Sequence, residues 1–328
     1  MKAYICDQYG PPEVLKLRDV EKPSLKSKEV LIKVKASTVN AADCNIRGLT
    51  YIPKGMGFVA KLMLGVNKPK IAVQGSVLAG DVVEVGDEVK QFKPGDKVFS
   101  TGPHFGGYGE FAVGKASGAI SLMPGNISYE EAATVPYGGL TALYFLKNMA
   151  DIQKGQKVMV IGASGGVGVY AVQLASYFGA EVTGVCSTKN IDFVKSLGAR
   201  RVIDYTKEDL TQLDEKWDII LDVVVKKTSF KKYKGSLTKN GLYLAVAGGI
   251  GDMLQMIRTS ITGGKKVKFG GGEKCEIRSN LDFLARLIEE NKIKPVLDKT
   301  FEFKDMVEAH RYAESGAKKG NIAITVGN

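Results

Sequence analysis

Four glycines between an apolar run and a helix-like stretch are the residues best suited to hold a phosphate. The segment VMVIGASGGVG, residues 158–168, contains Gly162, Gly165, Gly166 and Gly168. Glycines let the backbone turn tightly and approach a pyrophosphate, and the N–H groups at a helix start supply donors and partial positive charge. The match is GASGGVG rather than a strict G-x-G-x-x-G, so a tight turn that binds nothing stays an alternative. The strand–turn–helix context nevertheless predicts a dinucleotide site.

The end of the next apolar run predicts which dinucleotide binds. A site that prefers NAD has an Asp or Glu about 20 residues further on, which accepts from the ribose 2′-hydroxyl. Here the sequence reads VCSTKN, with Ser187, Thr188 and Lys189 in that place. An acid would repel a 2′-phosphate, whereas two hydroxyls and a cation can donate to one. We therefore predict NADPH, with Tyr205 of VIDY as a further contact. The alternative is that Lys189 only begins a helix.

The segments around these residues predict an α/β protein with two domains. Residues 1–125 are short β segments separated by turns, which indicates a small β-rich, barrel-like domain. From about Tyr129 the apolar residues take helical spacing, and strands then alternate with helices from KVMVIGA to GLYLAVAGG. That alternation predicts a doubly wound parallel sheet of the Rossmann type. We place this nucleotide-binding domain at 126–265 and the other domain at 1–125 and 266–328.

Composition limits the classes of partner. The formal net charge is +11, but the lysines of 226–241 are interleaved with only two aromatics, so we expect no nucleic-acid surface. No apolar stretch approaches the roughly 18 residues that a membrane span needs. The segment MKAYICDQYGPPEVL turns polar too soon for a secretory signal, and the four cysteines have no C-x-x-C spacing. We expect a cytoplasmic protein in a reducing compartment.

The segment 51–75 combines apolar residues with lysines. It could cover a substrate cleft or lie on an anionic membrane. A simple packed helix is the third interpretation.

The chain resembles the medium-chain dehydrogenase/reductase superfamily. The resemblance rests on ASTVNAADCNIRG (36–48), GDVVEVGDEVKQFKPGDKVFS (80–100), EEAATVPYGGLTAL (130–143), the glycine cluster and KGNIAITV (319–326), and it runs nearly end to end. Within the superfamily the chain is similar to the zinc-free quinone oxidoreductase branch, which includes chloroplast-envelope homologues and bacterial relatives. The resemblance implies a GroES-like fold for the β-rich domain and a homodimer.

The resemblance also implies that no metal is bound. In the zinc alcohol dehydrogenases of this superfamily, a Cys and a His-Glu pair stand where this chain has Asn40, Ser76 and Val77. Amide and hydroxyl groups cannot replace thiolate and imidazole as tight zinc ligands. Cys44 is expected to be a small core residue rather than a lone ligand. Without a Lewis acid, the expected reaction is hydride transfer to an already electrophilic quinone or α,β-unsaturated carbonyl, an enone or enal.

Site residues follow from the resemblance. Asn40 is expected near the nicotinamide, with its NH₂ donating to a developing enolate oxygen and its carbonyl accepting from a ribose hydroxyl. Tyr108 and Tyr51 are candidates to line the pocket or donate a proton, although a packed ring is an equal alternative for each. His310 is expected at the surface, and His104 lies in a loop near the pocket. The remaining cofactor contacts implied are Thr141, Ser164, Val167, Val246, Ala247, Phe269 and Gly270.

Three functions fit these patterns. The first is an NADPH-dependent, zinc-independent reductase of quinones or enones, with a small hydrophobic substrate. The second is a metal-free ketone or aldehyde reductase that uses the same site. The third is a nucleotide-binding protein with little turnover, similar to the lens crystallins of this superfamily.

Overall fold

The computed structural model describes residues 1–50, 52, 57–101, 106–224, 229–246, 250–270 and 274–327. The chain separates into two compact units. Unit 1 contains the described residues within 1–52, 57–140 and 276–327, and unit 2 contains those within 141–275. The two-domain α/β fold expected from the sequence is therefore confirmed.

Unit 1 is built on a mainly antiparallel sheet. Its strand order is β14-β15-β3-β4-β5-β7, with β6 also paired to β3, and only the β14–β15 pair is parallel. The strands are β3 (Glu29–Thr38), β4 (Val77–Val85), β5 (Lys97–Thr101), β6 (Phe111–Lys115), β7 (Ile120–Leu122), β14 (Leu297–Glu302) and β15 (Asn321–Thr325). A separate antiparallel pair joins β1 (Lys2–Cys6) to β2 (Leu15–Asp19). Apolar side chains of β3, β4 and β15 form its core.

The helices of unit 1 place its polar residues. They are α1 (Ala41–Gly48), α2 (Gly57–Leu64), α8 (Arg278–Glu289) and α9 (Met306–Glu314), together with most of α3 (Tyr129–Leu143). Two residues, Val39 and Asn40, separate the end of β3 from the start of α1. Helix α9 buries Met306, Ala309 and Ala313 against the core, which is the spacing of one helix face.

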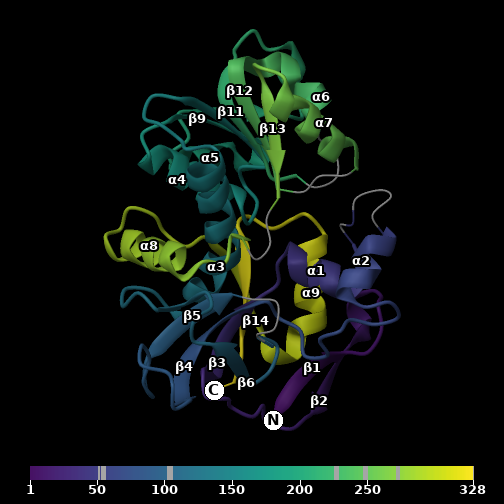
Figure 1. Ribbon diagram of the computed structural model, residues 1–328, viewed down its shortest axis with the longest axis vertical. Coiled ribbons are helices and arrows are strands. Elements are labelled where there is room, and N and C mark those ends of the chain that lie inside the picture. The colour runs from purple at the N-terminus through teal and green to yellow at the C-terminus, as the bar shows by residue number, and fades with distance from the viewer. Residues whose placement is uncertain are drawn as a thin grey trace. The chain divides into compact units, whose positions relative to one another are not determined.

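Unit 2 is a doubly wound parallel sheet. Among the described residues it has six strands in the order β10-β9-β8-β11-β12-β13, and every pair is parallel. They are β8 (Lys157–Ile161), β9 (Glu181–Cys186), β10 (Arg201–Asp204), β11 (Trp217–Asp222), β12 (Leu237–Ala245) and β13 (Lys266–Phe269). The helices are α4 (Gly168–Tyr177), α5 (Ile191–Ser196), α6 (Phe230–Tyr233) and α7 (Ile250–Ile261), and a π-helical segment, Tyr144–Met149, precedes β8. Figure 1 shows β11, β12 and β13 side by side.

Two findings differ from the sequence-based expectations. The expected boundary between 265 and 266 falls just before β13, yet β13 pairs with β12 and so belongs to the parallel sheet. The interpretation of 51–75 as a packed helix is wrong for its helical part, because α2 buries none of its residues and leaves Phe58 80 % and Met63 70 % exposed. Within the described residues, no helix is both long and apolar enough to span a membrane.

Candidate active site

The glycine turn connects β8 to α4 in unit 2. Gly162 has a φ of +85°, which favours glycine, and a Cβ on Gly168 would lie 2.1 Å from the Gly162 carbonyl oxygen. The fold of the chain itself therefore requires these two glycines. At Gly165, by contrast, an added Cβ would meet only the Gly162 oxygen, at 3.4 Å. Because internal packing does not require a glycine there, the open position fits the close approach of a pyrophosphate to the start of α4.

The strand order puts this turn where a cofactor is expected. Strand β8 lies between β9 and β11, so the chain leaves β8 toward one side of the sheet and enters β11 on the other, which defines a topological switch point. Because all six strands are parallel, their carboxyl ends meet at one edge. Several predicted cofactor residues lie at this edge. Phe269 is the last residue of β13, and four others directly follow the last residue of a strand: Ser187, Tyr205, Val246 and Gly270.

Not every predicted cofactor residue can be placed in this way. Thr141 lies in α3 and is almost buried, and Val167 directly precedes the first residue of α4. Ser164 accepts a hydrogen bond from Asn190 Nδ2 at 3.0 Å, so its hydroxyl is already oriented. Ala247 lies outside the described residues.

The predicted 2′-phosphate position is more selective than the sequence suggests. Strand pairing sets Cys186 opposite Asp204, which brings Ser187 beside Tyr205. Thr188 Oγ1 donates its proton to Asp204, so the expectation that this hydroxyl donates to a phosphate needs correction. Hydrogen bonds from Thr188 and Thr206 hold the pKa of Asp204 below its usual value. The sequence shows this acid in VIDY but not its partner, because the contact joins two different strand ends.

Two groups at this position keep their donors available. Within the described residues, the Ser187 hydroxyl and the Lys189 ammonium form no hydrogen bond or ion pair. Lys189 is also exposed. The Tyr205 ring is also exposed. Ser187, Lys189 and Tyr205 are therefore the residues that can contact a 2′-phosphate without breaking an internal bond.

In unit 1, Asn40 caps the first turn of α1. Its Oδ1 accepts from the backbone N–H groups of Ala42 at 2.8 Å and Asp43 at 3.2 Å. A carbonyl oxygen has two lone pairs, so both are occupied, and the expected acceptor role toward a ribose hydroxyl is not supported. The amide Nδ2 donates one hydrogen to Ser76 Oγ at 2.9 Å and retains a second. Asn40 therefore remains a candidate donor only.

Asp43 connects Asn40 to Ser76. One of its carboxyl oxygens accepts from the Asn40 backbone N–H and the other from the Ser76 backbone N–H, each at 2.9 Å. The side chain is completely buried, and this burial raises the pKa of Asp43 to about 6, although the two backbone hydrogen bonds oppose the rise. Sequence reasoning missed Asp43. Its position three residues after an N-cap Asn is a capping-box pattern that could have identified it.

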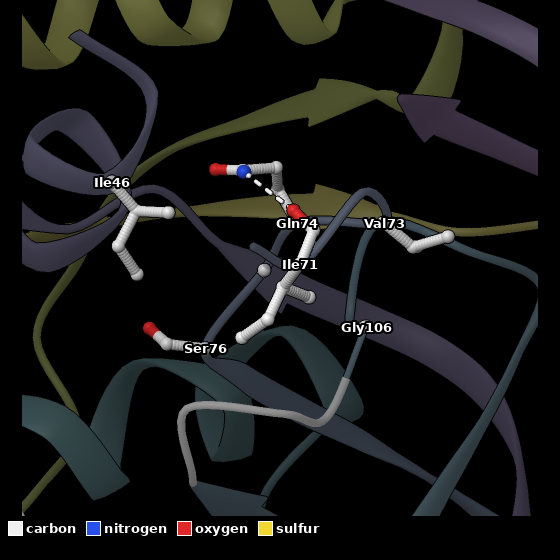
Figure 2. Close-up of a pocket in the computed structure, with 7 residues that line it drawn as sticks. Ile46, Ile71, Val73, Gln74, Ser76 and Gly106 are labelled. Atoms are coloured by element: carbon white, nitrogen blue, oxygen red, sulfur yellow. Dashed lines mark hydrogen bonds between the residues drawn. The ribbon is translucent and has the colours of Figure 1, made fainter. Parts of the chain in front are cut away.

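A small pocket lies beside Ser76. It has a volume of about 10 Å³, roughly the room that one water molecule needs. Its lining consists of Ile46, Ile71, Val73, Gln74, Gly75, Ser76 and Gly106. Figure 2 shows these residues, with the Gln74 amide bonded to the Ile71 carbonyl oxygen at 3.2 Å. The Ser76 hydroxyl thus borders a space with mainly apolar walls.

Behind Asp43 lies a buried polar chain formed by Tyr108, His310 and Arg47. The expectation that His310 is a surface residue is wrong, because its side chain is completely buried. Arg47 Nε donates to His310 Nδ1 at 3.3 Å, so the ring proton is on Nε2, which lies 3.0 Å from the Tyr108 hydroxyl. Burial lowers the pKa of His310 to about 3, so the ring is neutral. Arg47 also forms an ion pair with Glu314.

The two tyrosine candidates have different outcomes. Tyr108 is fully buried, its hydroxyl donates to the Thr38 carbonyl oxygen at 3.3 Å, and burial raises its pKa well above the usual value. This arrangement favours the packing role that the sequence left open. Tyr51 lies outside the described residues, as does His104.

The donor set does not fit zinc. Asn40 and Ser76, which occupy the positions of two zinc ligands in the zinc enzymes, are hydrogen-bonded to each other, and Val77 is buried in β4. Within the described ranges, no group of three His, Cys, Asp or Glu side chains could hold a metal. All four cysteines are described and buried, none of them is joined in a disulfide, and Cys44 is the core residue expected.

Comparisons with known proteins agree with this geometry. Residues 26–144 match the alcohol dehydrogenase GroES-like domain, and residues 197–324 match the zinc-binding dehydrogenase family. The chain is 35 % identical to a chloroplast envelope quinone oxidoreductase homolog of Arabidopsis thaliana, with 92 % of this chain and 91 % of the relative covered. It is 32 % identical to the mitochondrial NAD(P)H oxidoreductase RTN4IP1 of Mus musculus, covering 99 % and 89 %. An NADPH-dependent alkenal/one oxidoreductase of Arabidopsis thaliana is 30 % identical, covering 99 % and 79 %.

Two solved structures share the whole fold. The quinone oxidoreductase of Coxiella burnetii has a TM-score of 0.85 at 30 % identity, covering 100 % of this chain and 99 % of that one. The Escherichia coli quinone oxidoreductase complexed with NADPH has a TM-score of 0.83 at 25 % identity, covering 99 % and 100 %. The chain belongs to the medium-chain dehydrogenase/reductase superfamily, within its quinone oxidoreductase branch. It is accordingly an oxidoreductase.

Proposed function

We propose that this protein is an NADPH-dependent reductase that transfers hydride to a quinone or to an α,β-unsaturated carbonyl. The observation that carries the proposal is the hydrogen bond between Asn40 and Ser76 beside the small pocket. Neutral donors stand where the zinc enzymes place a Lewis acid, so the site suits substrates that are electrophilic without a metal. The relatives named as quinone and alkenal/one oxidoreductases support the same reaction class.

Each unit contributes its own part of the mechanism. The turn around Gly165 and the start of α4 bind the pyrophosphate, while Ser187 and Lys189 bind the 2′-phosphate. Bound NADPH supplies the hydride. The second Nδ2 hydrogen of Asn40 donates to the substrate oxygen as negative charge develops there. The apolar walls of the pocket exclude water, which strengthens that donor.

The test is an NADPH oxidation assay with three substrate classes. We expect turnover with a quinone and an enone, much slower turnover with a simple ketone, and no loss of activity after treatment with a chelator. Faster reduction of the ketone than of the enone would favour the metal-free ketone or aldehyde reductase. NADPH binding without turnover of any substrate would favour the nucleotide-binding protein, and zinc-restored activity after chelation would contradict the donor-based mechanism.

Four properties accompany this proposal. Zinc independence rests on the Asn40–Ser76 pair. The four cysteines, none of which is joined in a disulfide, fit a reducing compartment such as the cytoplasm. The homodimer rests on the family resemblance, and light scattering of the purified protein tests it. The exposed apolar residues of α2 fit either a cover for the substrate or contact with a membrane.

A further inference from the structure

The proposed reaction needs a proton donor. Hydride addition to the β-carbon of an enone leaves an enolate, which must take up one proton to give the saturated ketone. Tyr108 is enclosed in the core of unit 1. Of the seven residues that line the pocket, Ser76 is the one with a hydroxyl, and the Gln74 amide already donates to a backbone carbonyl. Among the described residues, the Ser76 hydroxyl is therefore the group best placed to deliver a proton to this space.

The hydrogen bonds of Ser76 fix its orientation and leave its own proton available. Its Oγ accepts from Asn40 Nδ2 at 2.9 Å, its backbone N–H donates to Asp43 Oδ1, and its carbonyl accepts from Thr101 Oγ1 at 3.1 Å. The Ser76 side chain also hydrogen-bonds to the Asp43 carboxyl, and Ser76 lines the pocket, so the hydroxyl links Asp43 to that space. A hydroxyl can accept one proton while it gives up another, so Ser76 can connect the two.

Asp43 has the environment of a carboxylic acid rather than of a salt-bridged carboxylate. It is completely buried, and none of the ion pairs among the described residues includes it. The nearest cation on its helix, Arg47, is engaged by Glu314 and His310. A buried carboxyl without a counter-ion favours the protonated form, and burial raises the pKa of Asp43 to about 6. The same environment lets it release a proton at neutral pH, because two backbone N–H groups stabilise the carboxylate.

We propose that Asp43 and Ser76 together form the proton donor of the reductase, with Asp43 storing the proton and Ser76 transferring one to the reduced substrate. This inference rests on the proposed function. The hydride forms the new C–H bond at the β-carbon, and the C=C electron pair moves to give the enolate. The Ser76 O–H bond then breaks as its proton passes to the enolate, while the Asp43 O–H bond breaks and its proton passes to Ser76 Oγ. After product leaves, the site opens to solvent again, and a proton from solvent returns to Asp43 through Ser76.

Tyr108, Cys44 and His310, which surround Asp43, have pKa values shifted away from the range in which Asp43 titrates. From the loop before β6, Tyr108 faces Asp43 with a raised pKa; on α1, burial raises the pKa of Cys44 to about 12. On α9, burial lowers the pKa of His310 to about 3, and Arg47 of α1 donates to its ring. Glu314 pairs with Arg47, and Lys318, whose pKa is lowered by burial, lies beside Cys44 rather than Asp43. An inflection near pH 6 in enone reduction that disappears in Asp43→Asn is therefore assignable to Asp43.

The experiment compares Ser76→Ala, Ser76→Thr and Asp43→Asn, with Thr101→Val as a control that removes a different hydrogen bond to Ser76. We expect Ser76→Ala and Asp43→Asn to lower kcat for an enone by about 100-fold, the lower end of general-acid catalysis. Reduction of a quinone should fall less than about 10-fold, because the hydroquinone anion is stable enough to take its proton from water. Ser76→Thr keeps the hydroxyl and should restore most enone turnover. NADPH affinity and thermal melting verify folding of each variant.

Two further measurements separate proton delivery from a structural role. In the parent, kcat/KM for the enone should fall as the pH rises through about 6, because the protonated acid is the active form, and this fall should disappear in Asp43→Asn. The solvent isotope effect on kcat should also disappear in Ser76→Ala. Equal losses for enone and quinone, or a pH dependence that persists in Asp43→Asn, would overturn the proposal. If the parent turns over neither substrate, the proposed function fails and this inference fails with it; turnover with unaffected variants overturns this inference alone.

Discussion

The preference for NADPH over NADH is expected to depend on Ser187 and Lys189 but not on Thr188. A hydrogen bond to a charged group contributes about 1.5 to 3 kcal/mol. Lys189 is exposed, and salt screens its charge. We therefore expect Lys189→Ala to reduce the difference in binding free energy between NADPH and NADH by about 1 to 1.5 kcal/mol, at or just below that lower limit. This corresponds to a roughly 5- to 13-fold smaller ratio of NADH to NADPH dissociation constants. The double variant with Ser187→Ala should lose about 2 to 3 kcal/mol.

Thr188→Val distinguishes the structural argument from the sequence pattern. The Thr188 hydroxyl donates to Asp204, so its removal should leave the cofactor preference within about twofold and affect mainly local stability. Calorimetric titration with both cofactors at low and high salt measures the ratio, and the Lys189 contribution should shrink as salt rises. Lys195→Ala in α5 is the matched control for loss of an exposed cation. A Thr188→Val effect as large as that of Lys189→Ala, or an unchanged ratio in Lys189→Ala, would refute the reasoning.

Five other variants, at four positions, test the site by activity, stability and pH. Asn40→Ser keeps an N-cap oxygen but loses the amide donor. It should lower kcat for an enone by about 100-fold and leave the melting temperature nearly unchanged. Asn40→Ala removes the cap as well and should lower the free energy of unfolding by about 1 kcal/mol. Gly165→Ala should weaken NADPH binding without lowering thermal stability, whereas Gly168→Ala should lower stability because its Cβ would lie 2.1 Å from a backbone oxygen. His310 has a pKa of about 3 in the folded protein against 6.5 in the unfolded chain, so its contribution to the free energy of unfolding is present above pH 6.5 and is lost as the pH falls toward 3. This acid destabilisation is at most about 4 to 5 kcal/mol. His310→Gln should reduce it, as measured by urea titrations at several pH values. Equal melting temperatures for the two Asn40 variants, or for the two glycine variants, or identical acid profiles with and without His310, would each contradict the corresponding reasoning.

The sequence predicts the fold well because the information for it is local. Each strand of unit 2 is a short apolar run followed by a turn, and burial of such runs between helices leaves few alternatives to a parallel sheet. The position of His310 could have been predicted in the same way. Met306, Ala309, His310 and Ala313 have the i, i+3, i+4, i+7 spacing of one helix face, and all are buried in α9. Residue type had suggested the surface, and the helical spacing predicts the interior.

The site is harder to predict because its polar partners come from distant segments. Ser76 follows Asn40 by 36 residues, and the contact exists only because β4 pairs with β3 and returns the chain to the start of α1. Thr188 and Asp204 meet because β9 and β10 are neighbours in the sheet. Neither pairing has a pattern in the sequence. The Asn40–Asp43 capping box, by contrast, is local and could have been recognised from its three-residue spacing.

In the proposed mechanism, the Asn40–Ser76 pair takes the place of a metal, and this exchange limits which substrates the site can reduce. Hydride addition to a simple ketone places a full charge on one alkoxide oxygen, and zinc stabilises such a charge by several kcal/mol. The proposed amide donor of Asn40 carries no formal positive charge, and one such donor contributes about 2.7 to 4 kcal/mol only where the site is preorganised. In an enolate or a hydroquinone anion the charge spreads over several atoms, so each oxygen carries less charge and needs less stabilisation from a donor. Selectivity for conjugated substrates therefore follows from the weakness of the donor set, and the dry apolar walls around Ser76 increase it, because water that could solvate an alkoxide is kept out.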